Sequence, residues 1–212
     1  MKSVKFLLLF LVVALASPAG TVFFEGFDEN GAPIDDDTNG GSRIGNTQFY
    51  LSSGSIDLVG GSYYSQLCSA PASGYCIDTT GAGNQRGVIY APITLGPGNY
   101  VLSFDLEAWY TTDITDANAV VQVDFGGVGG LIVPQSIQVV GGNTYAPISI
   151  PFTVASTVTD YLTFTDQGGT YPFAGAILDN VEIDTSSVPE PGSVVLFGVG
   201  ALILLASKRA RR

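Results

Sequence analysis

The chain has 212 residues, 46% of them hydrophobic, and it contains no histidine. Its formal net charge is −11, and the negative charge is concentrated between residues 20 and 187, where two basic and 18 acidic residues give −16. Such an acidic surface repels nucleic acid and suits either divalent cations or simple solubility outside the cell. The lack of histidine excludes the Ser-His-Asp and Cys-His arrangements of nucleophilic hydrolases.

The N-terminus has the three parts of a secretory signal peptide. Residues 1–5 are basic, residues 6–14 are apolar, and Ala14-Leu15-Ala16 is a cleavage site of small residues, with Ser17-Pro18-Ala19 as a second candidate. We predict that residues 1–19 are removed during export. The alternative is a retained N-terminal membrane helix. The remaining segment, 20–187, is long enough for one domain with a good core.

Short runs of alternating apolar and polar residues fill the segment 20–187. The clearest is Leu102-x-Phe104-x-Leu106, which has Asp105 and Glu107 on its opposite face. Further strands are expected near 22–27, 47–51, 55–59, 87–95, 121–125, 148–154, 162–164 and 177–183. Turns are expected at 60–61, 96–99, 126–127, 141–143 and 168–169. Eight or more strands at this spacing predict an all-β fold, an antiparallel β-sandwich.

Two carboxylates lie in the apolar register of their strands. They are Glu25 in Phe23-x-Glu25-x-Phe27 and Asp179 in Ile177-x-Asp179-x-Val181. A buried carboxylate protonates, pairs with another group or binds a metal. First and last strands of such a sandwich can lie side by side, so Glu25 and Asp179 are candidates for part of a Ca²⁺ site, which needs six to eight oxygen ligands. The alternative is that Asp179 caps a turn and Glu25 sits at an exposed strand end.

The run from Asp35 to Gly40 matches the start of an EF-hand loop, but Asn46 stands where the final Glu is needed and no helices flank it. We interpret this run as a solvated acidic loop. The two cysteines, Cys68 and Cys76, predict a disulfide that closes a small loop in an exported chain. A metal or redox role is less favoured, because the spacing is not Cys-x-x-Cys.

Trp109 shares the outward face of its strand with Asp105 and Glu107. Aromatic rings beside acids on an exposed sheet face can stack on and hydrogen-bond a sugar, and Tyr110, Tyr161 and Tyr171 are further candidates. The alternative is that Trp109 packs under a loop or at a sheet edge. Asp105 and Glu107, about 7 Å apart along a strand, could also be a glycosidase pair. Since no other feature supports catalysis, we predict a protein that is not an enzyme.

The C-terminus joins a rigid spacer, an apolar segment and a basic stop. Pro189 and Pro191 favour an extended, accessible peptide around Glu190. Residues 192–206 carry no charge and would form a helix of about 22 Å, which is short for a bilayer core of about 30 Å. The basic residues that follow predict a cytoplasmic end for a transmembrane helix; they are Lys208, Arg209, Arg211 and Arg212. The alternative, a core helix that ends the domain, would be amphipathic.

This arrangement resembles the PEP-CTERM sorting signal of Gram-negative bacteria that make exopolysaccharide. The resemblance implies recognition and processing by exosortase, a membrane cysteine transpeptidase, and passage from an inner-membrane anchor to the cell surface or extracellular matrix. The stretches 93–106 and 175–183, with Phe24-Glu25, resemble jelly-roll modules of the carbohydrate-binding type. In those modules acidic residues at the places of Glu25 and Asp179 help to hold a structural Ca²⁺.

We therefore predict a signal peptide (1–19), a β-sandwich domain (20–187) and a sorting signal (188–212). Our leading hypothesis is an exported surface or matrix protein associated with exopolysaccharide. One alternative is a structural matrix protein or adhesin without a defined sugar ligand. Another is a secreted jelly-roll glycosidase or lyase.

Overall fold

The computed structural model describes residues 20–28, 34–37, 40–61, 67–68, 74–81, 85–108, 118–140, 145–171 and 175–186. All of them belong to one compact unit, Gly20–Ser186. The predicted signal peptide and sorting signal lie outside the described residues, and so does Trp109. Within the part of the chain that is described, no helix is long and apolar enough to cross a membrane.

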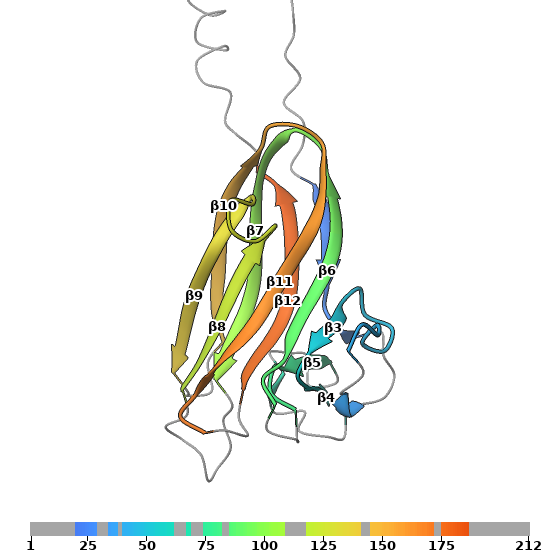
Figure 1. The fold of residues 1–212 in the computed structure, drawn as a ribbon, viewed down its shortest axis with the longest axis vertical. Coiled ribbons are helices and arrows are strands. Elements are labelled where there is room, and N and C mark those ends of the chain that lie inside the picture. Colours follow the sequence, from blue (N-terminus) through green and yellow to red (C-terminus); the bar gives the residue numbers. More distant parts are fainter. Residues whose placement is uncertain are drawn as a thin grey trace, which may run out of the picture. The chain divides into compact units, whose positions relative to one another are not determined.

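The described residues form two antiparallel sheets that pack face to face (Figure 1). The strands, in chain order, are β1 (Thr21–Glu25), β2 (Ile34–Asp37), β3 (Tyr50–Ser53), β4 (Ile56–Gly60), β5 (Tyr75–Asp78), β6 (Val88–Leu95), β7 (Gly98–Ala108), β8 (Asn118–Phe125), β9 (Ile132–Val140), β10 (Ala146–Val154), β11 (Val158–Gly169) and β12 (Ala176–Thr185). The seven-stranded sheet has the order β10-β7-β12-β5-β4-β2, with β1 also paired to β12, and the five-stranded sheet has the order β3-β6-β11-β8-β9. The predicted antiparallel β-sandwich is confirmed.

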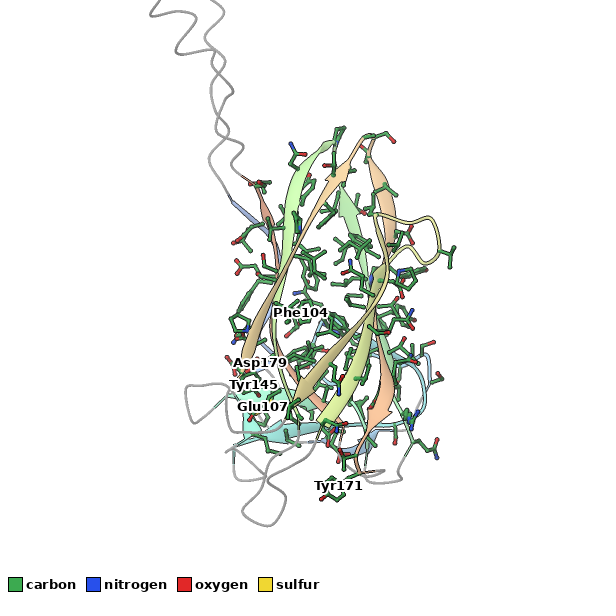
Figure 2. The ribbon with its side chains drawn as sticks, turned by 90° about the vertical axis from the view of Figure 1, so that its left-hand side faces the viewer. Phe104, Glu107, Tyr145, Tyr171 and Asp179 are labelled. Atoms are coloured by element: carbon green, nitrogen blue, oxygen red, sulfur yellow. A yellow bond between two sulfur atoms is a disulfide. The ribbon has the colours of Figure 1, made fainter. Side chains whose placement is uncertain are left out.

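The core lies between the sheets and follows the predicted alternation. Leu102, Phe104 and Leu106 of β7 are buried, and Phe104 points to the middle of the sandwich (Figure 2). Its ring meets that of Phe164 from the other sheet edge to face, at 5.1 Å between centroids, and Phe164 in turn lies 5.9 Å from Phe49. This aromatic contact across the sheets favours one alignment of the two layers, because aromatic pairs add specific geometry to apolar burial.

The first and last strands of the sandwich are joined by backbone and side-chain hydrogen bonds. β1 pairs with β12, as expected for the first and last strands. The N–H of Gly20 donates to Thr185 Oγ1 at 2.7 Å, and the N–H of Thr185 donates back to the Gly20 carbonyl at 3.0 Å. The next residue, Ser186, donates its N–H to the Asn99 carbonyl at 2.8 Å. The hydrogen-bonded fold therefore extends to Ser186.

Two expectations about loops and turns were wrong. Residues 34–37 form β2, which pairs with β4, so the backbone of Asp35-Asp36-Asp37 lies in an edge strand and not in a loop. The predicted turn at 168–169 is the end of β11, where the pairing with β8 shifts between Asp166 and Gly168. Gly168 has φ +94°, a conformation that glycine adopts at a β-bulge.

Candidate functional site

Four residues from four neighbouring strands form a line across the outer face of the five-stranded sheet. Tyr50 of β3 pairs with Tyr90 of β6. Tyr90 pairs with Thr163 of β11, and Thr163 pairs with Asp124 of β8. Directly opposite residues in an antiparallel sheet project from the same face, so the four side chains are neighbours. We call Tyr50, Tyr90, Thr163 and Asp124 the transverse row.

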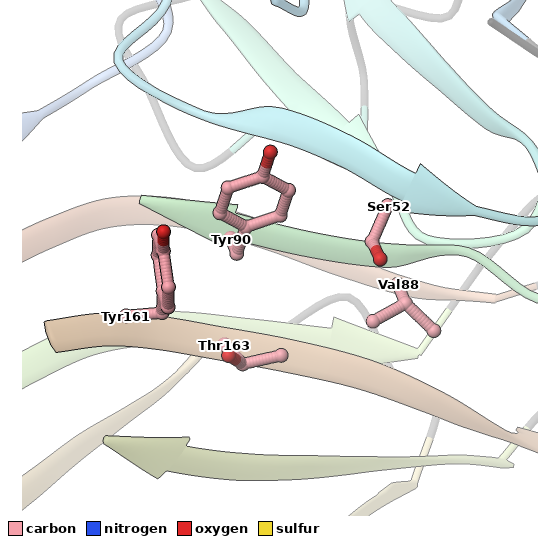
Figure 3. A pocket seen from close by; sticks show the side chains of 5 residues that line it. All are labelled: Ser52, Val88, Tyr90, Tyr161 and Thr163. Carbon is pink, nitrogen blue, oxygen red and sulfur yellow. The ribbon is translucent and has the colours of Figure 1, made fainter. Parts of the chain in front are cut away.

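A hollow of about 320 Å³ lies over the middle of this row (Figure 3). Its lining residues are Ser52, Val88, Tyr90, Tyr161 and Thr163. Tyr90 stacks on Tyr50 with 5.5 Å between ring centroids and meets Tyr161 at a right angle at 5.2 Å. Tyr161 is 54% exposed. Three tyrosine rings thus form one continuous aromatic surface beside two hydroxyl side chains.

The two basic residues of the segment 20–187 are engaged elsewhere. Arg43 donates from Nε to the Thr47 carbonyl and from Nη2 to the Asn46 carbonyl, the latter at 2.8 Å. Arg86 donates from Nη1 to the Gln167 carbonyl at 2.7 Å. The lining of the hollow contains no charged residue. Rings and hydroxyls without a charge partner can bind a polyhydroxylated ligand by stacking and hydrogen bonding.

The predicted sugar-binding face around Asp105 and Glu107 lies on the other sheet, and it is covered at Glu107. This residue is only 4% exposed, so the expectation of an open face there was wrong. Tyr145 and Asp179 lie beside it, as Figure 2 shows. The Tyr145 hydroxyl donates to the Leu67 carbonyl. Burial raises the pKa of Tyr145, and the charges of Asp179, Glu107 and Asp105 raise it further, so this hydroxyl stays a hydrogen-bond donor.

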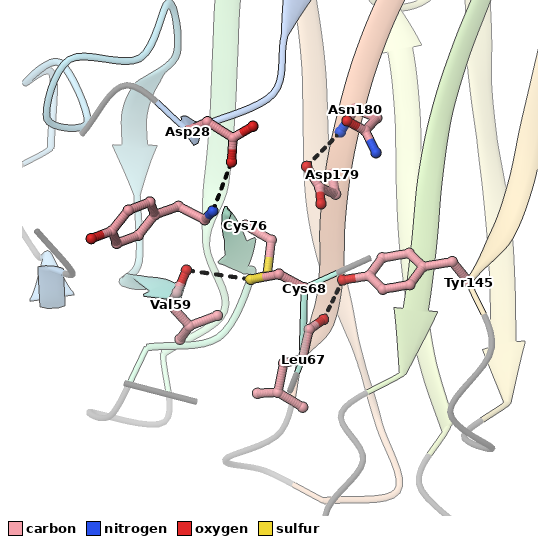
Figure 4. The surroundings of a disulfide bond; sticks show 9 residues. Asp28, Val59, Leu67, Cys68, Cys76, Tyr145, Asp179 and Asn180 are labelled. Atoms are coloured by element: carbon pink, nitrogen blue, oxygen red, sulfur yellow. Dashed lines mark hydrogen bonds between the residues drawn. A yellow bond between two sulfur atoms is a disulfide. The ribbon is translucent and has the colours of Figure 1, made fainter. Parts of the chain in front are cut away.

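The predicted disulfide is confirmed. Cys68 and Cys76 are joined, with their Cα atoms 5.4 Å apart (Figure 4). Cys76 packs in a small apolar cluster with Val59, Leu67 and Ile177, separate from the main core. Sγ of Cys68 lies 3.5 Å from the Val59 carbonyl oxygen. The disulfide therefore fixes the segment that carries Leu67, the hydrogen-bond partner of Tyr145.

Glu25 and Asp179 are both buried, as predicted, at 7% and 4% exposure. Each Glu25 oxygen accepts a backbone N–H, from Phe27 at 2.8 Å and from Gln48 at 2.6 Å, and Asp179 accepts the N–H of Asn180 at 2.8 Å. Among the described residues, no group of three or more His, Cys, Asp or Glu side chains is arranged for a metal. Both carboxylates therefore accept backbone N–H groups, and Glu25 joins two segments in this way. Calcium binding stays a prediction.

A second set of buried carboxylates was missed by the sequence reasoning. Asp57 and Asp78 are directly opposite on β4 and β5, and Asp166 of β11 accepts hydrogen bonds from the hydroxyls of Thr79, at 3.1 Å, and Thr80. Oδ1 of Asp78 accepts the Thr80 N–H at 2.9 Å. Asp57 could have been found as an acid inside the apolar run 56–60, where every position is buried.

The end of the chain is matched by a family model. Residues 187–212 fit the model of the PEP-CTERM protein-sorting motif. The chain carries a PEP-CTERM sorting motif. This motif includes the predicted recognition residues and the predicted basic stop, and all of them lie outside the described residues; they are Pro189, Glu190, Pro191, Lys208, Arg209, Arg211 and Arg212. The PEP-CTERM motif begins directly after Ser186, with no spacer domain between it and the sandwich.

Solved structures similar to this chain include carbohydrate-binding modules. The CBM22-1 xylan-binding domain of Paenibacillus barcinonensis Xyn10C has 11% identity, covering 80% of this chain and 97% of that chain, with a TM-score of 0.49. TmCBM61 in complex with β-1,4-galactotriose has 13% identity, 65% and 88% coverage and a TM-score of 0.44. A CBM4 structure has 13% identity, 76% and 97% coverage and a TM-score of 0.38. No curated protein matches the chain.

Proposed function

We propose that this is an exported surface protein whose sandwich domain binds polysaccharide without cleaving it. The observation that carries the proposal is the aromatic surface of Tyr50, Tyr90 and Tyr161 beside the hydroxyls of Ser52 and Thr163. An exposed ring such as that of Tyr161 offers apolar area that a sugar ring can cover, and the hydroxyls supply hydrogen bonds that orient it.

The PEP-CTERM motif supports the location in this proposal. It is the type of signal that an exosortase-type membrane transpeptidase processes, so the protein is held in the inner membrane before it reaches the surface or matrix. The ligand that suits this destination is the exopolysaccharide of the same cell. The alternative is a structural matrix protein or adhesin without a sugar ligand. It predicts that the tyrosine surface plays no part in retaining the protein in the matrix.

A glycosidase or lyase is the less favoured alternative. The pair considered for it, Asp105 and Glu107, lies on the seven-stranded sheet, away from the tyrosine surface. Glu107 is buried beside Tyr145, and a catalytic acid must reach the glycosidic oxygen of its substrate. The proposed binding surface contains no carboxylate pair that flanks the hollow.

Isothermal titration of the full-length protein in detergent with polysaccharide purified from its own host tests the proposal. Tyr161→Ala is expected to weaken binding about tenfold, because the loss of one stacking ring is worth about 1.4 kcal/mol. Phe24→Ala is the matched control, because Phe24 is an exposed ring of similar accessibility (52%) on the opposite sheet. If both variants melt at the same temperature as the unchanged protein, their folding is unaffected.

Equal binding by Tyr161→Ala and the unchanged protein would overturn the proposal. So would a failure of the unchanged protein to bind any polysaccharide fraction of the host. A loss of equal size in Phe24→Ala would point to a general effect of removing an exposed aromatic ring.

A further inference from the structure

Asp124 places one carboxylate at the end of the transverse row. It lies opposite Thr163, which itself lines the hollow and lies opposite Tyr90. Oδ1 of Asp124 accepts the N–H of Gly127 at 2.9 Å, which holds the carboxyl group at the start of the loop after β8. Neighbouring strands are about 4.8 Å apart, so the Cα atoms of Tyr90 and Asp124, two strands apart, are separated by about 10 Å across the sheet.

Neither basic residue among those the structure describes is paired with this carboxylate. The segment 20–187 has two basic residues against 18 acidic ones. Arg43 donates to the carbonyls of Asn46 and Thr47, and Arg86 donates to the carbonyl of Gln167. The negative potential at Asp124 is therefore available to a cation that arrives from outside.

The ligand groups that suit this combination are positively charged. The faces of the tyrosine rings attract a cation, and a carboxylate pairs with it at the far end of the row. A uronate or sulfate group would meet the charge of Asp124 in a domain with a net charge of −16. A protonated primary amine on a sugar would instead be attracted to both parts of the row.

We propose that the transverse row selects polysaccharides carrying protonated primary amines, that is, partly deacetylated amino-sugar polymers, over neutral and acidic ones. The inference rests on the proposed polysaccharide-binding function and names its ligand class. One sugar stacks on Tyr90 and Tyr161, the hydroxyl of Thr163 hydrogen-bonds along the row, and the ammonium group of a neighbouring sugar pairs with Asp124.

The test uses three soluble probes with the full-length protein in detergent. They are glycol chitosan, which has free amines, the same polymer after N-acetylation, and alginate, which has uronates. We expect binding to be about tenfold tighter for glycol chitosan than for its acetylated form, and no measurable binding of alginate. The titrations are repeated with the salt concentration raised from about 50 to about 500 mM. This change should remove most of the difference in affinity between the two polymers, because salt screens an exposed charge pair over roughly 10 Å or less.

Asp124→Asn and Asp184→Asn separate a specific contact from general attraction to an acidic domain. The first keeps an oxygen for the Gly127 N–H and removes the charge at the row. The second removes the same charge from β12 in the opposite sheet. Asp124→Asn should lower the affinity for glycol chitosan to the level of the acetylated polymer, and it should leave the affinity for the acetylated polymer unchanged. Asp184→Asn should keep the difference in affinity between the two polymers.

Equal weakening by Asp124→Asn and Asp184→Asn would overturn the inference, because it would show attraction to net charge alone. Equal affinity for the two forms of the chitosan polymer would also overturn it. If that equal binding is still lost in Tyr161→Ala, the proposed polysaccharide-binding function stands and only the preference for amines fails. If Tyr161→Ala changes nothing, the function itself fails.

Discussion

Asp57 and Asp78 lie directly opposite each other on β4 and β5, and both side chains are buried, at 5% and 1% exposure. Burial raises the pKa of Asp78 well above its usual range, and the nearby charges of Asp57 and Asp166 raise it further. The hydrogen bond from the Thr80 N–H opposes this shift and does not cancel it. Oδ2 of Asp78 is buried without a hydrogen-bond partner among the described residues. The sandwich thus contains a carboxyl group that favours its protonated form.

The first prediction concerns pH. An unfolded Asp has a pKa of about 3.9, and the folded Asp78 has a higher one, so between the two values the folded state binds more protons. Stability therefore falls as pH rises through this window, and the full cost is present above the folded pKa. Asp78→Asn removes the titrating group, so it should melt at a higher temperature than the unchanged protein at pH 7.

Thermal melts of both proteins from about pH 3 to pH 8 check this prediction. The advantage of Asp78→Asn should shrink toward zero below about pH 3.9, where the carboxyl group is protonated in both states. A difference in melting temperature that stays constant over the whole range would contradict the assignment to Asp78.

The second prediction compares two glycines that share a left-handed backbone. Gly54 has φ +77° and Gly127 has φ +67°. Alanine at either position costs about 1–2 kcal/mol for its conformation. At Gly54 the new Cβ would also lie 1.9 Å from the Arg86 carbonyl oxygen, whereas at Gly127 nothing lies within 4 Å. In urea unfolding, Gly54→Ala should therefore lower the free energy of unfolding by about 1–3 kcal/mol more than Gly127→Ala does. Equal losses in the two variants would be evidence against the close packing at Gly54.

The third prediction concerns the disulfide. Cys68 and Cys76 are separated by eight positions, and closing so short a loop stabilises a protein by about 2–3 kcal/mol in the chain-entropy model. The double variant Cys68→Ala/Cys76→Ala should lose about this amount in urea unfolding. Reduction of the unchanged protein is the control, because it should give a similar loss and should not affect the variant. No change in either experiment would contradict a structural role.

The fourth prediction concerns Glu25 as a backbone clamp. Its two oxygens accept the N–H groups of Phe27 and Gln48, and Phe27 holds an uncommon positive φ of 58°. Glu25→Gln keeps one oxygen as an acceptor, replaces the other with an NH2 group and removes the negative charge. It should therefore destabilise the domain by about 1.5–3 kcal/mol in the presence of a chelator. Val22→Ala, an exposed change on the same strand, is the control and should have little effect.

The same melting experiment tests calcium. A melting temperature that rises with Ca²⁺ in the unchanged protein and does not rise in Glu25→Gln would support the calcium prediction. Identical melting with Ca²⁺ and with chelator, together with the expected loss in Glu25→Gln, would leave the clamp as the role of this carboxylate.

The alternation of apolar and polar residues was sufficient to predict a strand where only one face of that strand meets the core. The alternation of Leu102, Phe104 and Leu106 predicted the inner face of β7, because a half-buried strand has a period of two. The pattern is lost where both faces are covered, and β4 is buried at all five positions, including Asp57. β9 was missed because its middle is polar and contains a proline, Pro134.

The candidate site could not be predicted in the same way. Tyr161 was recognised as a possible sugar contact because it is aromatic, but its partners come from β3, β6 and β8. Only the pairing register places Tyr50, Tyr90 and Asp124 in one line, and that register is set by contacts between distant parts of the sequence. Likewise, nothing local to Asp105-x-Glu107 showed that Glu107 would be buried beside Tyr145.

The position of β12 has a mechanical consequence. This strand leads, after Ser186, into the PEP-CTERM motif, and it is paired with β7 on one side and with β1 and β5 on the other. A pull along its axis would load the hydrogen bonds of these ladders together in shear. A strand at the edge of a sheet would instead be peeled off one bond at a time. The strand next to the PEP-CTERM motif in the sequence is therefore one that pairs with neighbours on both sides.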